Sequence, residues 1–175
     1  MGGYSEKGGE TVAEEKVTTC CFTGHRRISA EHMLRMNQAL DLVLDTLIRL
    51  GVTVFRTGGA VGFDTVVALK VLEKRQTAPH IRLELILPCR NQTDGWEEFN
   101  REAYDYVLRE ADEVTYLREN YTRGCMLDRN RHLVEGSQIC VGYCVTKRGG
   151  SAYTMEYAGK KGLRVVNIAP MVEHL

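Results

Sequence analysis

Residues 56–64 of the chain read Arg-Thr-Gly-Gly-Ala-Val-Gly-Phe-Asp and separate two segments of different character. Residues 52–55 are β-branched or aromatic, which is typical of a buried strand, whereas residues 65–72 are typical of a helix. The glycines therefore mark a strand-to-helix turn, where a ligand can approach the main chain. Free N–H groups at the start of such a helix favour an anion, above all phosphate. The alternative is a tight turn that binds nothing.

The size and charge of the chain limit the kinds of partner that it can have. Its 175 residues suffice for one compact domain with a hydrophobic core. The 23 Lys and Arg residues balance the 23 Asp and Glu residues, so no overall positive field attracts nucleic acid or anionic membranes. A local basic patch remains possible. No apolar run is long enough to cross a bilayer.

The cysteines and the N-terminus indicate a cytoplasmic protein. The six cysteines form no C-x-x-C pair, and the histidines lack the spacing of zinc ligands. Residues 1–7 have no apolar segment of the kind found in secretory signals. We therefore expect reduced thiols, no structural metal and a cytoplasmic location.

Strand-like and helix-like segments alternate along the chain with short connections. We expect strands at residues 17–23, 52–55, 81–87, 112–117, 138–145 and 163–168, with helices between them. Asp94 and Glu97 have the spacing of a capping box at the start of the third helix. This pattern predicts a three-layer α/β, Rossmann-like domain with a mostly parallel sheet of about six strands and helices on both faces. We expect one domain at residues 16–170, a flexible N-terminal tail at 1–15 and a short tail at 171–175.

In such a sheet, ligands bind beyond the carboxyl ends of the strands, near the point where the strand order reverses. The segments expected at that edge supply our candidate ligand-binding residues. These are Gly24, His25, Arg26, Gly58, Gly59, Ala60, Gly62, Asp64, Pro88, Arg129, Asn130, Gly149, Gly150, Ser151 and Thr154.

Each type of candidate has a chemical reason and an ordinary structural alternative. The guanidinium of Arg26 suits phosphate or carboxylate, but it could also be a solvated surface group. Gly149 and Gly150 open a helix that Ser151 could cap, and their N–H groups could hold a second phosphate. Asp64 could cap its helix or bind a ribose hydroxyl. Arg129 could reach over the strand ends or lie on a solvated helix face.

Two common nucleotide-binding motifs are absent from the sequence. The first predicted strand is followed by a single glycine rather than by G-x-G-x-x-G, which argues against an ordinary NAD dehydrogenase. The sequence also lacks the G-x-x-x-x-G-K-[ST] loop of ATP-hydrolysing enzymes. No definite cofactor follows from the residues.

Five sequence segments resemble the motifs of a known protein family and occur in the same order: residues 23–26, 57–64, 87–88, 129–131 and 149–158. In this respect the chain resembles the YpsA-like branch of the SLOG superfamily. The resemblance covers about residues 17–169 and implies a Rossmann-like sheet that binds a nucleotide or a nucleotide-derived ligand. The superfamily also contains DprA proteins, which bind single-stranded DNA, and LOG-type phosphoribohydrolases.

The resemblance leaves three functions open. The first, which we favour, is binding or sensing of a nucleotide-like small molecule without strong catalysis. The second is a hydrolase of nucleoside monophosphates, in which Arg129 and Glu156 would be catalytic because they occupy comparable places; Arg148, however, replaces the proline of that pattern. The third is DprA-like binding of single-stranded DNA, against which the neutral charge argues. A homodimer remains open.

Overall fold

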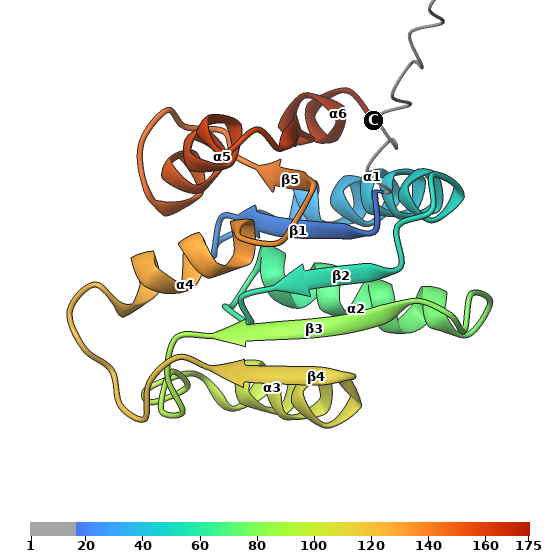
Figure 1. Ribbon diagram of the computed structural model, residues 1–175. Helices are drawn as coiled ribbons and strands as arrows, with labels where there is room; N and C mark the ends of the chain where they lie inside the picture. The colour runs from blue at the N-terminus through green and yellow to red at the C-terminus, as the bar shows by residue number, and fades with distance from the viewer. Residues whose placement is uncertain (1–16) are drawn as a thin grey trace, which may run out of the picture.

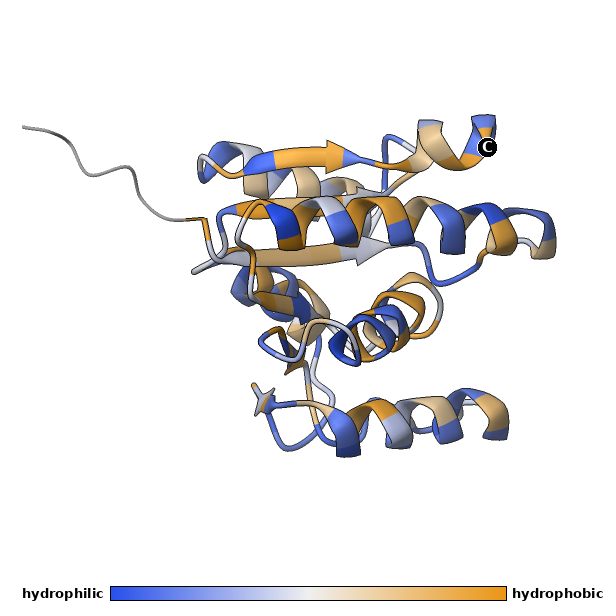
Figure 2. Cartoon of the chain, turned by 90° about the vertical axis from the view of Figure 1, so that its right-hand side faces the viewer, coloured by the Kyte–Doolittle hydropathy of each residue, from blue (hydrophilic) through white to orange (hydrophobic). Residues whose placement is uncertain are grey.

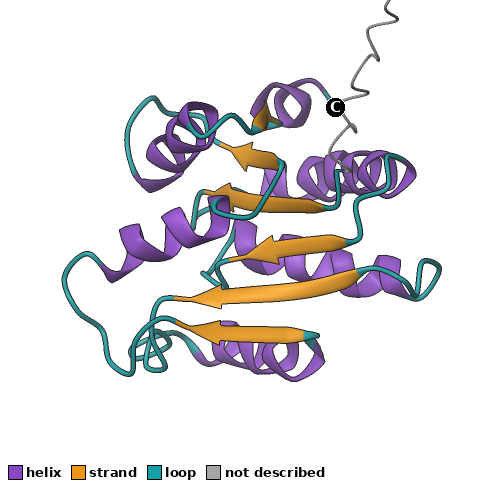
Figure 3. Ribbon diagram, in the orientation of Figure 1, coloured by secondary structure: helices purple, strands orange, loops and turns teal. Residues whose placement is uncertain are grey.

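Six strands form one parallel sheet in the order β4-β3-β2-β1-β5-β6. The computed structural model describes residues 17–175, so the tail expected at residues 1–15 lies outside the described residues. Figure 3 shows that the strands point in one direction. Their bounds are Thr19–Gly24 for β1, Val54–Thr57 for β2, Arg82–Leu87 for β3, Glu113–Tyr116 for β4, Ile139–Tyr143 for β5 and Arg164–Asn167 for β6.

The strand order reverses between β1 and β5. The chain moves outward from β1 to β4, then returns to the other side of β1 and continues to β6. Cys21 of β1 is in register with Arg56 of β2 on one side and with Cys140 of β5 on the other. The loops after β1 and β5 therefore leave the sheet side by side, which is where this class of fold binds its ligands. The predicted Rossmann-like sheet is confirmed, and all of its strands are parallel.

Helices cover both faces of the sheet (Figure 1). On one face, α1 lies between α6 and α2, and α2 in turn contacts α3. On the other face, α4 packs against α5. Their bounds are Ala30–Arg49 for α1, Phe63–Arg75 for α2, Glu98–Glu110 for α3, Cys125–Val134 for α4, Gly150–Lys160 for α5 and Ala169–His174 for α6.

The core consists of two apolar layers, one on each face of the sheet. The larger lies under α1 and α2 and includes Phe22, Phe55 and Phe63, which are fully buried. The smaller lies under α4 and α5 and includes Leu133 and Ala158. Figure 2 shows hydrophobic and hydrophilic residues alternating along the helices, as expected when one side of each helix packs on a sheet.

Three helix boundaries differ from those expected. Helix α3 begins at Glu98 with Glu97 at its N-cap, because the left-handed backbone of Gly95 interrupts the helix that Asp94 was expected to cap. Helix α5 begins at Gly150 with Gly149 at its N-cap, so Ser151 lies inside the helix and is not the cap.

The third difference concerns the C-terminus. Residues 171–175, expected to form a tail, contain most of α6. Val172 is fully buried against the large core layer, and Pro170 lies in the first turn, where its missing N–H costs no helical bond.

None of the helices in the described residues is long and apolar enough to cross a membrane.

Candidate functional site

A cavity of about 320 Å³ lies beyond the carboxyl ends of β1 and β5. It brings together four segments that are far apart in the sequence: the loop after β1, the β2–α2 turn, helix α4 and the start of α5. Nine of our candidate residues line it: Gly24, His25, Arg26, Ala60, Asp64, Arg129, Asn130, Gly150 and Ser151.

Arg129 is the central charged residue of this cavity. It lies on α4, and only 6% of its surface is exposed. Its guanidinium donates from Nη1 to the carbonyl oxygen of Gly58 and from Nε to Oδ1 of Asn130, at 2.8 Å for the latter. The same Nη1 lies 3.4 Å from Oδ2 of Asp64, which is 5% exposed. A buried ion pair with these additional bonds fixes α4 to the β2–α2 turn.

The carboxylate of Asp64 serves the fold from inside the site. It accepts a hydrogen bond from the main-chain N–H of Ala60 at 3.2 Å, which closes the turn, while Gly62 occupies the N-cap of α2. Burial raises the pKa of Asp64, whereas Arg129 and the Ala60 N–H oppose that rise. Burial is also the main cause of a lowered pKa at Arg129, to which the nearby Arg26 contributes. Two guanidinium groups therefore face one carboxylate, which leaves the cavity with a surplus of positive charge.

The loop after β1 forms the wall beside β5. His25 accepts a hydrogen bond at Nε2 from the main-chain N–H of Val145, at 2.9 Å, so a neutral His25 carries its proton on Nδ1. The main-chain N–H of Phe63 donates to the carbonyl oxygen of His25 at 3.1 Å. A side chain at Gly62 would overlap the main chain of Arg26. The loop is thus held from both sides, and the exposed Arg26 side chain lies at the mouth of the cavity.

The first turn of α5 supplies main-chain donors. Its N-cap is Gly149, and no side chain of the described residues caps this turn. Gly150 and Ser151 line the cavity, so N–H groups of the first turn lie next to it. A Cβ atom at Gly150 would meet nothing closer than Nδ2 of Asn130, at 3.7 Å. This helix start therefore has the space and the polarity to accept an anion.

The six remaining candidates lie outside the cavity, and the protein itself covers three of them. Arg129 occupies the space beside Gly58, and Leu87 and Gln92 lie against Gly59. The hydroxyl of Thr154 donates to the carbonyl oxygen of Gly150 at 2.7 Å and is buried. Gly62, Pro88 and Gly149 also do not line the cavity. The glycine turn after β2 thus binds the protein's own arginine.

Glu156 and Arg129 are not brought together. Successive residues of a helix are about 100° apart, so Glu156 points away from the side of α5 on which Ser151 and Thr154 are buried. Glu156 is exposed and pairs with Lys160, which lowers the pKa of its carboxyl group.

Three lining residues were not among our candidates: Thr23, Met126 and Leu133. Met126 and Leu133 share a face of α4 with Arg129 and Asn130, since their spacing is i, i+3, i+4 and i+7. That spacing is visible in the sequence. Thr23 immediately precedes the Gly24 loop.

The described residues contain no group of three His, Cys, Asp or Glu side chains that could hold a metal ion. The six cysteines are free and buried. The carboxylate of Asp64, the one acidic side chain among the described residues that line the cavity, is already bonded to Arg129 and to the main-chain N–H of Ala60. The arrangement therefore suits binding of an anion better than acid–base chemistry.

Breaking the buried ion pair from one side should be costly. We expect Arg129→Met and Asp64→Asn each to lower the free energy of unfolding by about 3–5 kcal/mol, because each leaves a buried charge without its partner. The double variant should lose less than the sum of the two, since neither charge remains. Urea denaturation of the four proteins measures this. Additive losses would contradict the proposed pairing.

We expect position 58 to need a glycine because Arg129 fills the space beside it, and not because of the backbone angles of Gly58. Gly58→Ala places a methyl group on the guanidinium, so we expect a loss of about 1–3 kcal/mol, and little further loss when it is added to Arg129→Met. Gly150→Ala is the matched control, because its Cβ has room and it should not destabilise the fold. Equal effects of Gly58→Ala in both backgrounds would refute this explanation.

Comparison with known proteins identifies relatives of this chain. A UPF0398 protein from Halalkalibacterium halodurans is 31% identical over 129 residues, which are 72% of this chain and 68% of that protein. A UPF0398 protein from Bacillus thuringiensis is 28% identical over 130 residues, covering 73% and 71% of the two chains.

Two solved structures share the fold. DNA processing protein A from Streptococcus pneumoniae aligns with a TM-score of 0.61 at 18% identity, over 86% of this chain and 50% of that one. The Helicobacter pylori protein, whose structure is described for its single-stranded DNA binding, gives a TM-score of 0.61 at 17% identity, over 86% and 64%. The chain thus spans between half and two thirds of these proteins. Residues 21–167 match the YspA SLOG family, to which this chain therefore belongs.

Proposed function

We propose that this protein binds or senses a nucleotide, or a ligand derived from one, through a phosphate group held in the cavity between β1 and β5. The observation that carries the proposal is the surplus of positive charge: Arg26 and Arg129 face a single carboxylate, beside an uncapped helix start. A volume of about 320 Å³ lies at the lower end of the range for small-molecule sites.

In this proposal, the phosphate is held mainly by the first turn of α5 and by Arg26. The N–H groups of Gly150 and Ser151 would donate to its oxygens, and the helix dipole favours the negative charge. Arg129 would attract the phosphate through its positive charge, because its guanidinium N–H groups already bond to Gly58, Asn130 and Asp64. The free thiols fit a reducing compartment, so we place this function in the cytoplasm.

Thermal unfolding in the presence of candidate ligands tests the proposal. We would measure melting temperatures with inorganic phosphate, nucleoside mono- and diphosphates, cyclic nucleotides, NAD and ADP-ribose. A ligand at 100 times its Kd adds about 2.7 kcal/mol, which is roughly 5–11 °C for a protein of this size. Unchanged melting temperatures across the whole panel would refute the proposal.

Two neighbouring arginines provide a matched pair of variants. Arg26 and Arg27 are both exposed, but only Arg26 lines the cavity. We expect Arg26→Ala to raise the Kd of a phosphate ligand by roughly 10- to 100-fold, the value of a charged hydrogen bond. Arg27→Ala should leave it nearly unchanged. Equal losses in both variants would indicate general attraction of anions rather than a defined site.

Single-stranded DNA is a second candidate ligand, and the rim of the cavity favours it. Lys147 and Arg148 in the loop before α5 are exposed, as is Arg27, and none of the three forms an ion pair within residues 17–175. Such a rim could follow a phosphate backbone beyond one nucleotide.

Salt dependence distinguishes these two ligands. Binding of a labelled oligothymidylate that contacts several phosphates should weaken steeply with salt, with a slope near 0.7 per phosphate on logarithmic axes. Lys147→Ala with Arg148→Ala should reduce that slope while leaving mononucleotide binding in place. No binding of the oligonucleotide at low salt would exclude this second candidate.

The hydrolase alternative lacks comparable support. Glu156 lies on the exposed side of α5 and pairs with Lys160, so it cannot act on a substrate in the cavity in this conformation.

A further inference from the structure

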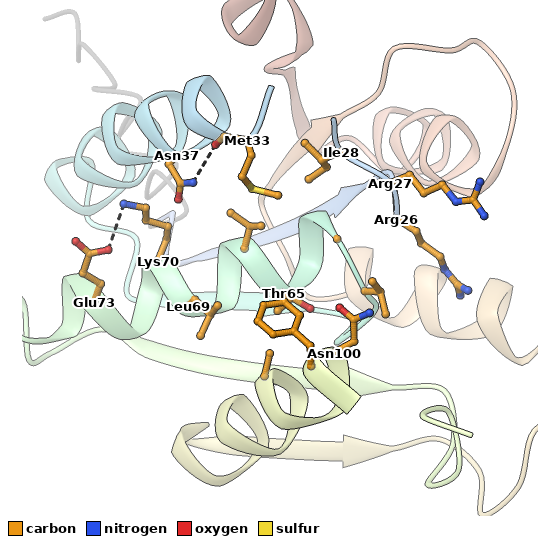
Figure 4. Close-up of a pocket in the computed structure, with 15 residues that line it drawn as sticks. Arg26, Arg27, Ile28, Met33, Asn37, Thr65, Leu69, Lys70, Glu73 and Asn100 are labelled. Carbon is orange, nitrogen blue, oxygen red and sulfur yellow. Dashed lines mark hydrogen bonds and ion pairs between the residues drawn. The ribbon is translucent and has the colours of Figure 1, made fainter. Parts of the chain in front are cut away.

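A second and larger hollow lies on the other side of the Arg26 loop. This groove has a volume of about 630 Å³ and runs between α1 and α3, with α2 as its floor. Figure 4 shows Arg26 and Arg27 at one end, Lys70 and Glu73 at the other, and Leu69 between them. Its walls are mainly apolar, and they include Ile28, Met33, Val61, Val66, Leu69, Phe99 and Ala103.

Phe99 on α3 is the most exposed large apolar side chain in the described residues. Its exposed fraction is 78%, although it lines the apolar groove. Tyr104 and Val107 of α3 are buried in the large core layer, whereas Phe99, in the first turn of the helix, lies outside that packing. A solvent-exposed aromatic ring beside an apolar groove indicates a surface that contacts another protein.

Lys70 and Glu73 line one end of the groove and pair with each other, whereas most charges around the rest of the groove are separated by sign. Glu97, Glu98, Glu102 and Asp105 are exposed on or next to α3, and none of them forms an ion pair within the described part of the chain. Arg101 is the one basic residue in residues 97–105. At the end of the groove opposite Lys70 and Glu73, Arg26 and Arg27 are exposed and basic. The patch therefore has an acidic side and a basic end.

We propose that this groove is the contact surface of a two-fold homodimer, in which Phe99 of each copy enters the groove of the other. In a two-fold contact the same patch serves both copies, so a projecting group must lie beside the hollow that receives its counterpart. Phe99 and the groove meet that condition. The charges meet it as well, because the acidic side of one copy can face the basic end of its partner.

This contact lies directly beside the candidate binding site. Arg26 lines both the groove and the phosphate cavity, and the Val61–Gly62 turn separates the two. The dimer does not depend on the proposed function, however, and its test requires no ligand.

Light scattering after size-exclusion chromatography measures the dimer directly. We expect the wild-type chain to approach twice the 19.7 kDa of one copy as its concentration rises from roughly 1 to 200 µM, and Phe99→Asp to remain at the mass of one copy. Phe99→Asp should fold normally because the ring is exposed, and its melting curve checks this.

Leu50→Asp is the matched control. Leu50 is 57% exposed and lines a different apolar hollow, between α1 and β6, so its substitution should leave the dimer intact. Loss of the dimer in Leu50→Asp with retention in Phe99→Asp would place the contact elsewhere and overturn the proposal. A wild-type chain that stays monomeric over the whole range would also overturn it.

Charge reversal tests the orientation of the two copies. Arg27→Glu, and separately Glu98→Arg with Glu102→Arg, should each raise the dimer Kd at least tenfold at low salt, because like charges then face each other. Combining all three substitutions should restore most of the affinity. A dimer Kd that responds to none of these changes would overturn the proposed pairing of rims.

Discussion

The guanidinium of Arg129 occupies the space that a side chain at residue 58 would need, and the geometry of the site depends on this contact. Through it, a helix on one face of the sheet is bonded to the turn that leads to a helix on the other face. Without Gly58 the arginine would have no room, and without Asp64 its charge would be buried alone. Of these residues, Arg129 and Asp64 also line the candidate cavity.

The fold also explains how a chain without net charge can have a cavity with more basic than acidic side chains. Charged residues balance over the whole sequence, but the fold distributes them unevenly. Two acidic residues near the strand ends are already paired, Asp128 with Arg118 and Glu119 with Arg90. Inside the cavity, one carboxylate faces two guanidinium groups. Net charge therefore argues against a large basic surface but does not describe a site of this size.

Sequence patterns predicted the fold class and nine of the twelve residues that line the cavity. Alternating strands and helices gave the parallel sheet, because each element must bury its apolar side on the next layer. Arg26, Gly150 and Ser151 were found because loops after parallel strands meet at one edge. Gly58 and Gly59 were also expected to face a ligand. A glycine indicates only that something approaches the main chain, and here Arg129 and Gln92 do so.

The sequence alone determined the order of the helices and strands, the strand-to-helix turns and the set of segments at the carboxyl edge of the sheet. These features follow from local conformational preferences and from hydrophobic periodicity. The tertiary structure decided which donors remain for a ligand, where Glu156 points and which apolar side chains stay exposed. These features depend on contacts between residues far apart in the chain, such as Arg129 with Gly58, and on which side of each helix packs against the sheet. A single sequence does not fix either of them, because many pairings satisfy the same local pattern.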